Sequence, residues 1–189
     1  MKLTRLLLSL ASVSLALHAQ QAPQAPATAA QPRLLCMFFD LNTMDAAAQS
    51  KALDNAVQFV QQQATPSDRI SVMTYTSQLN VLQDFTDSRD GVLAALRTIM
   101  PSDAGNGAAA NPGPEFDIFI ADRQLAAIQR AVEILAAFPE KKAMLYFSSG
   151  IPRDGVDNQA QLRATTSAAV RANVSIYPVD SSGLSLPPR

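Results

Sequence analysis

The sequence contains a continuous apolar run from Leu34 to Phe39 that ends at an aspartate, Asp40. The run has the length of a β-strand and no polar alternation, which is typical of a central strand that is covered on both faces. A carboxylate at the carboxyl end of such a strand, just before a helix, is how open α/β sheets build ligand sites. We therefore expect a helix-covered sheet with a candidate binding site at Asp40.

Strand-like and helix-like segments alternate through the rest of the sequence. Apolar residues with helical spacing predict amphipathic helices over residues 45–64, 87–100, 117–137 and 158–172. Further β-rich segments cover residues 69–76, 79–85, 143–147 and 174–179. The first two of these strands are separated only by Ser77 and Gln78, which predicts a hairpin. The alternation of strands and helices predicts a mainly parallel sheet with right-handed crossovers.

The first residues are typical of a secretory signal peptide. Lys2 and Arg5 precede an apolar stretch, and Leu17-His18-Ala19 is a plausible cleavage site. A membrane anchor is the alternative, but about 12 apolar residues are too few against the roughly 20 that span a bilayer. We expect a signal peptide over residues 1–19, a Pro/Ala/Gln-rich linker over 20–32, one domain over 33–184 and a tail over 185–189. The mature chain would be exported to the periplasm or the cell exterior, without membrane insertion.

Composition excludes several classes of function. The whole chain has a net charge of −1, and loss of the signal peptide removes two basic residues, so nucleic acid is not an expected partner. His18, the only histidine, is lost with the same segment, which removes the commonest general base. Neither a Gly-x-Ser-x-Gly elbow nor a Walker glycine loop occurs, so we do not expect an enzyme. Cys36, the single cysteine, lies in the first apolar run and is expected to be a buried thiol.

The order of elements from Arg33 to Leu184 resembles that of a von Willebrand factor type A domain. The phrases that carry the resemblance, including that to a related family of secreted acidobacterial proteins, are RLLCMFFD, DRISVMTY, LQDFTDSRD, KKAMLYFSSG and NVSIYPVDSSGL. The resemblance implies a three-layer α/β/α, Rossmann-like, doubly wound sheet of strand order 3-2-1-4-5-6, with strand 3 antiparallel. The last strand and helix of such domains are not recognisable in this sequence.

The resemblance also implies a metal site built from three loops at the upper edge of the sheet. The first loop would carry an Asp-x-Ser-x-Ser motif, whose positions are filled by Asp40, Asn42 and Met44. The third loop would carry Thr-Asp-Gly, and Ser149 stands where the aspartate would be, within Ser148-Ser149-Gly150.

The second loop of the family would supply a threonine. None occurs between Thr98 and Thr165, although Asp117 or Asp122 could stand in. Magnesium prefers oxygen ligands, and the thioether of Met44 is a poor partner for it. We therefore expect a degenerate metal-ion-dependent adhesion site (MIDAS) without a cofactor. The alternative is a magnesium site on Asp40, Asn42 and Asp117.

These patterns predict an exported protein-interaction module. Its partner-binding face would contain the degenerate metal positions Asp40, Asn42, Met44, Ser148, Ser149 and Gly150. The long segment 101–115 is expected to be a loop, either for recognition or as a tolerated insertion. Two local alternatives stay open: Asp40 could cap the next helix, and residues 148–150 could be a simple turn. Two functional alternatives are a metal-dependent adhesion domain and a structural remnant or part of a larger protein.

Overall fold

The computed structural model describes residues 32–102, 114–149 and 158–180, with the side chains of residues 114–117 and 180 not described. The predicted signal peptide, nearly all of the linker, residues 103–113 of the predicted loop, Gly150 and the predicted tail lie outside the described residues. Within the described part, no helix is both long enough and apolar enough to cross a bilayer.

The described residues form alternating strands and helices close to the predicted ranges. In chain order they are β1 (Leu34–Asp40), α1 (Ala46–Gln62), β2 (Arg69–Tyr75), β3 (Leu79–Thr86), α2 (Arg89–Arg97), α3 (Pro114–Leu135), β4 (Lys142–Ser148), α4 (Gln159–Arg171) and β5 (Val174–Asp180). The predicted loop 101–115 is too long by two residues, because α3 begins at Pro114. Proline is accepted in a first helical turn, where its missing N–H needs no partner.

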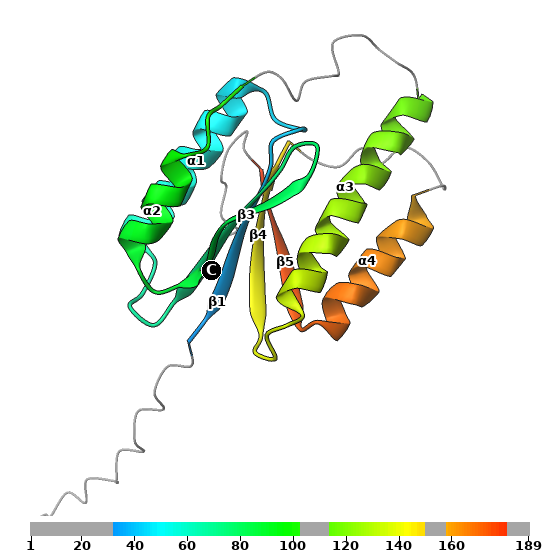
Figure 1. Cartoon of the computed structure of the whole chain (residues 1–189). Coiled ribbons are helices and arrows are strands. Elements are labelled where there is room, and N and C mark those ends of the chain that lie inside the picture. Colours follow the sequence, from blue (N-terminus) through cyan, green and yellow to red (C-terminus); the bar gives the residue numbers. More distant parts are fainter. Residues whose placement is uncertain (1–31, 103–113, 150–157, 181–189) are drawn as a thin grey trace, which may run out of the picture. The chain divides into compact units, whose positions relative to one another are not determined.

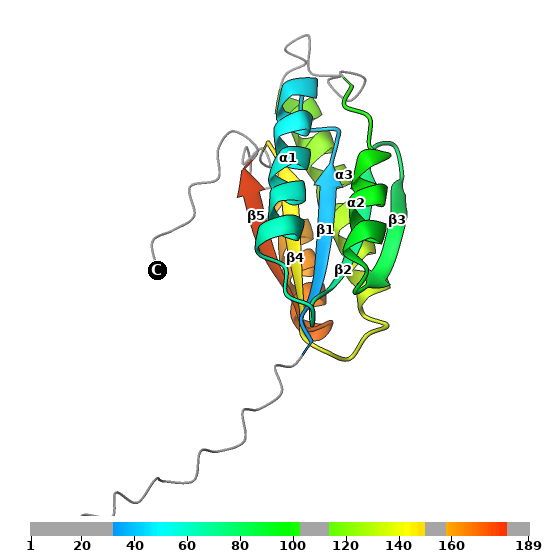
Figure 2. The same cartoon turned by 90° about the vertical axis from the view of Figure 1, so that its left-hand side faces the viewer.

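The sheet has the strand order β3-β2-β1-β4-β5. Strands β1, β2, β4 and β5 run parallel, and β3 pairs with β2 in the antiparallel direction. Helices α1 and α2 cover one face and α3 and α4 the other (Figures 1 and 2). This arrangement confirms the three-layer, mostly parallel fold class with one antiparallel edge strand.

Strand β1 is central because it is apolar on both faces. All seven of its residues are buried, and it pairs with both β2 and β4. Met37 and Phe39 point into the core under α1 and α2, whereas Cys36 and Phe38 point into the core under α3 and α4. As predicted, Cys36 is a free, buried thiol, and burial raises its pKa to about 12.

Helix α1 is capped by Asp45, the residue that directly precedes it. The Asp45 carboxylate accepts a hydrogen bond from the Ala48 N–H at 2.7 Å. Ala52, Ala56 and Val60 form the buried stripe at helical spacing. Asp40 is therefore not the cap of this helix, which leaves its carboxylate for other partners.

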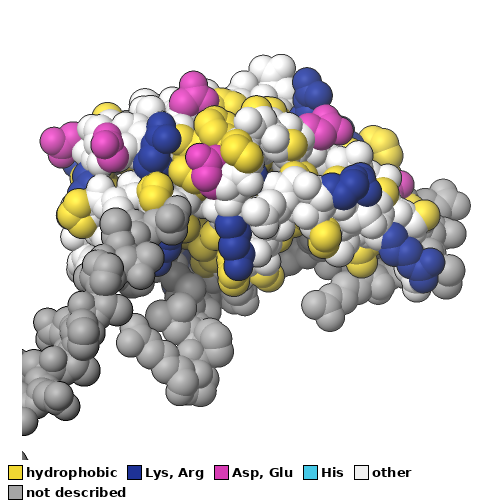
Figure 3. All heavy atoms as spheres, turned by 90° about the horizontal axis from the view of Figure 1, so that it is seen from below, with side chains coloured by type: hydrophobic (Ala, Val, Ile, Leu, Met, Phe, Trp, Pro, Cys, Tyr) yellow, Lys and Arg dark blue, Asp and Glu magenta, His cyan; other side chains and the backbone are white. Residues whose placement is uncertain are grey.

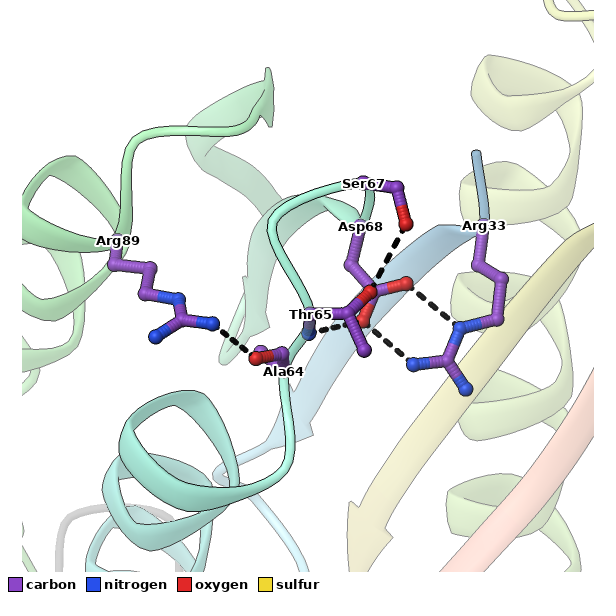
Figure 4. Close-up of polar contacts among 6 residues, drawn as sticks. All are labelled: Arg33, Ala64, Thr65, Ser67, Asp68 and Arg89. Carbon is purple, nitrogen blue, oxygen red and sulfur yellow. Dashed lines mark hydrogen bonds and ion pairs between the residues drawn. The ribbon is translucent and has the colours of Figure 1, made fainter. Parts of the chain in front are cut away.

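An ion pair ties together the lower ends of β1 and β2. The Arg33 guanidinium donates to both oxygens of Asp68, and the Thr65 N–H donates to the same carboxylate (Figure 4). Beside it, Arg89 donates to the carbonyl of Ala64, which lies in the turn after α1. Arg33 is the first residue after the predicted linker and directly precedes β1, so the ion pair anchors the chain where it enters the sheet.

The lower surface carries mixed charge. Where Figure 3 shows this face, Lys and Arg side chains lie interspersed with Asp and Glu side chains and with apolar ones. A nucleic-acid-binding surface typically carries a continuous basic stripe. On the part of this face that Figure 3 shows, charges of both signs alternate and no such stripe is visible.

Candidate functional site

The candidate site lies at the carboxyl ends of β1 and β4. The two strands are parallel neighbours with Phe39 opposite Phe147, and the two rings stack with centroids 4.5 Å apart. This register places Asp40 beside the end of β4, where Ser148 and Ser149 follow. The carboxyl ends of these two parallel strands therefore lie side by side.

Asp40 is fully buried, and protein donors satisfy both of its carboxylate oxygens. Oδ2 accepts from the Tyr146 hydroxyl at 2.8 Å and from the Gln124 side-chain amide at 3.2 Å. Oδ1 accepts from the Asn42 N–H at 3.2 Å. Burial raises the pKa of Asp40, although the hydrogen bonds from Tyr146, Gln124 and Asn42 act in the opposite direction.

Hydrogen bonds connect the loop after β1 to two other loops. The Thr43 hydroxyl donates to the Asp40 carbonyl at 3.1 Å and accepts from the Ser149 N–H at 3.3 Å. The Asn42 side-chain amide donates to the carbonyl of Thr76, in the turn between β2 and β3. Three loops at the upper edge of the sheet are thus joined through Asn42 and Thr43.

Gln49, a buried glutamine on α1, forms hydrogen bonds to the loop after β1. Its side-chain amide donates to the carbonyls of Leu41 at 3.1 Å, Met44 at 2.8 Å and Ser102 at 2.9 Å. Its carbonyl oxygen accepts from the Ser102 N–H at 3.0 Å. Gln49 therefore connects the loop after β1 to the segment that follows α2.

The predicted face residues differ in accessibility. Asn42 is half-buried and Ser149 is exposed, whereas Asp40, Met44 and Ser148 are buried. Met44 belongs to the apolar core under α1 and α2. A direct contact of Met44 or Asp40 with a partner is incompatible with this burial, so these two residues lie behind the accessible surface. Gly150 lies outside the described residues.

The described residues do not fit the magnesium site that the type A fold implies. Both Asp40 oxygens already accept hydrogen bonds, and Met44 points into the core. Asp122 is exposed on α3, and the side chain of Asp117 is not described. Among the residues that the structure describes, no group of three or more His, Cys, Asp or Glu is placed to hold a metal ion. A hard cation needs several oxygen ligands that are free to coordinate it.

Gln124 and Tyr146 were not predicted as site residues. Tyr146 lies between Leu145 and Phe147 in β4, and Gln124 lies on the buried stripe of α3 beside Leu125. A polar side chain at such a position needs a buried partner. A polar residue at a buried position was thus the sequence signal for both residues. The sequence does not identify Asp40 as their common partner.

Comparisons with known proteins reveal similarity in structure only. Neither the family models nor the curated proteins contain a match. Similar solved structures include an aerotolerance-related membrane protein from Bacteroides fragilis, with 14% identity, a TM-score of 0.50 and coverage of 78% of this chain and 67% of that chain. BatB from Bacteroides thetaiotaomicron is 13% identical, with a TM-score of 0.50 and coverage of 78% and 66%.

A third similar structure comes from an animal. Proximal thread matrix protein 1 from the mussel byssus is 12% identical, with a TM-score of 0.53, and the match covers 78% of this chain and 35% of that chain. The chain thus spans about two thirds of the length of the two Bacteroides proteins and about one third of the mussel protein. At these identities the likeness establishes the fold alone. Together with the strand order and the antiparallel β3, it shows that the chain has a fold of the von Willebrand factor type A kind.

Proposed function

We propose that this chain is an exported protein-interaction module that binds a protein partner without a cation. The contact would be made by what we call the upper face, which consists of Asn42, Thr43, Thr76 and Ser149. Export rests on the signal-peptide pattern of residues 1–19 and would deliver the module to the periplasm or the cell exterior.

The observation that carries this proposal is the burial of Asp40 behind the upper face. Both of its carboxylate oxygens accept hydrogen bonds inside the protein, so the surface above it presents neutral amide and hydroxyl groups. Such groups can donate and accept hydrogen bonds to a partner backbone or to polar side chains. The hydrogen bonds among the three loops hold these groups in one arrangement, which lowers the entropy cost of binding.

The fold and the composition support an interaction module over an enzyme. The mature chain as predicted contains no histidine that could activate Ser148 or Ser149. One protein of similar fold is named as a matrix protein of the mussel byssus thread.

The test is a binding experiment with the mature chain and the proteins of the envelope and medium, captured by crosslinking. The double variant Asn42→Ala/Ser149→Ala removes one amide and one hydroxyl from the upper face. The control Ser50→Ala/Gln58→Ala removes the same groups from the exposed side of α1. We expect the first variant to lose a captured partner that the control retains, with capture unchanged by chelator. Capture that requires a divalent cation, or that survives in the upper-face variant, would contradict the proposal.

A second candidate role is that of a part within a larger assembly. Strand β5 is an outer strand of the described sheet, Tyr177 on it is 51% exposed, and Leu145 of β4 beside it is only half-buried. In Figure 2, α1 and α2 lie in front of the sheet, and β5 lies to one side of them. Light scattering on the mature chain decides, because a stable monomer at high concentration argues against an obligate partner at this flank.

A further inference from the structure

The two oxygens of the Asp40 carboxylate accept hydrogen bonds from different parts of the structure. Oδ2 faces inward, where it accepts from Tyr146 on β4 and Gln124 on α3. Oδ1 faces the loop, where it accepts from the Asn42 N–H. Tyr146 and Gln124 therefore fix the orientation of the carboxylate group. That orientation determines the position at which Oδ1 accepts from the Asn42 N–H.

An ionised carboxylate without compensation is costly in a protein interior. A bound cation is one means of compensation, and hydrogen-bond donors are another. Two side-chain donors and one backbone N–H supply it here. The Tyr146 ring is itself held in place, because it is buried and stacks on Phe38 with ring centroids 5.5 Å apart.

We propose that Tyr146 and Gln124 are positioning residues that provide the compensation a cation would otherwise give, and that they hold the loop Leu41–Met44 in place through Asp40. The inference concerns the order of this loop and does not depend on whether the upper face binds a partner. This role goes beyond the proposed function, because Tyr146 and Gln124 do not belong to the upper face and yet would determine how its loop is arranged.

The charged and titratable surroundings of Asp40 make the proposal testable through pH. Tyr146 faces Asp40 from β4, and Tyr75 lies opposite Asp40 on β2. Burial and the neighbouring Asp40 carboxylate raise the pKa of Tyr146, so its phenol stays protonated and can donate. Asp45 before α1 and Asp122 on α3 are exposed. The side chains of Asp117 and Asp180 are not described.

The experiment measures amide hydrogen exchange and chemical unfolding on the mature chain. The variants are Tyr146→Phe, which keeps the stacked ring but removes the donor, and Gln124→Leu. The matched controls are Tyr177→Phe and Gln58→Leu, which change exposed residues in the same way. We expect the Asn42 amide to exchange about 10- to 100-fold faster in both test variants, as for loss of a hydrogen bond to a charged group. The controls should exchange at the wild-type rate.

The pH profile separates a charge-compensating role from simple packing. The destabilisation by Tyr146→Phe should be larger at alkaline pH than at acid pH, because Asp40 loses its proton as the pH rises and a protonated Asp40 needs less compensation. An equal loss at both pH values, or wild-type exchange of the Asn42 amide in both test variants, would overturn the inference.

A charge-neutral background keeps the test decisive if Tyr146→Phe alone does not fold. Asp40→Asn removes the charge that needs compensation, so Tyr146→Phe should cost less in that background than in the wild type. A double variant that folds where the single variant does not supports the inference. The absence of coupling between the two substitutions overturns it.

Discussion

Arg33 and Asp68 form a bidentate ion pair at the lower ends of β1 and β2. The guanidinium Nε lies 2.7 Å from Oδ1 of Asp68, and Nη2 lies 2.6 Å from Oδ2. The Asp68 side chain is fully buried, whereas 56% of the Arg33 side chain is exposed. This geometry satisfies both carboxylate oxygens, with the Thr65 N–H as an additional donor.

Loss of this pair should weaken the fold moderately. We expect Arg33→Ala to lower the free energy of unfolding by about 1 kcal/mol, because solvent screens the exposed half of the pair. Denaturant unfolding measures the change. Arg163→Ala, an exposed arginine on α4, serves as control and should change stability little. An equal loss in the two variants would show that the pair contributes nothing specific.

Asp68 and Asp40 should affect the pH dependence of stability in opposite directions. Burial raises the pKa of Asp68, but hydrogen bonds from Arg33 and Thr65 outweigh it, so the pKa of Asp68 lies below its ordinary value. Its contribution to stability is therefore present above the ordinary aspartate pKa and is lost as the pH falls through the lowered value. Asp40 has a raised pKa, so its contribution falls as the pH rises from the ordinary value through the raised one.

Unfolding experiments from acid to neutral pH test these signs. Relative to wild type, Asp68→Asn should lose its destabilising effect as the pH is lowered. Asp40→Asn should gain in relative stability as the pH is raised. The reverse trend for either variant would mean that the corresponding carboxylate is in a different environment from the one described.

Met44 should act as a core residue. Met44→Ser, which brings the loop closer to the family motif, should lower the free energy of unfolding by about 2–5 kcal/mol, since it removes buried apolar volume. It should not create magnesium binding, because the Asp40 oxygens stay occupied by protein donors. Met100→Ser changes an exposed methionine and should have little effect. A stable Met44→Ser variant that binds magnesium would refute this assignment.

Pro178 should protect the edge of β5 that pairs with no other strand among the described residues. The Lys142 N–H donates to the Asn173 carbonyl, so alternate residues from Asn173 direct their backbone polar groups toward β4. Pro178 belongs to the other set and faces the open edge, where it has no N–H to offer a second strand. Pro178→Val should increase self-association in light scattering. Pro101→Val, at an exposed position outside any strand, is the control. Unchanged self-association in Pro178→Val would contradict the protective role.

The sequence predicted the fold well because the fold depends on periodicity. The apolar run of β1 and the alternation of strands and helices set the layers, and each parallel strand must end at the same edge. The neighbouring positions of the carboxyl ends of β1 and β4 followed from that rule. The hairpin of β2 and β3 followed from the short polar break at Ser77 and Gln78 between two β-rich segments.

The partners of Asp40 could not be predicted in the same way. Gln124 and Tyr146 are 84 and 106 residues from Asp40 in sequence, and their contacts depend on how α3 packs over the sheet. The position of Met44 was also missed. A residue at a motif position was expected at the surface, whereas hydrophobic burial turned its side chain into the core.

Titration of the mature chain with Mn²⁺ by calorimetry tests the central claim most directly. Because Asp40 is buried and its oxygens are bonded to Tyr146, Gln124 and Asn42, we predict no binding at micromolar concentrations and the same melting temperature with and without chelator. Stoichiometric micromolar binding that disappears in Asp40→Asn would contradict the account.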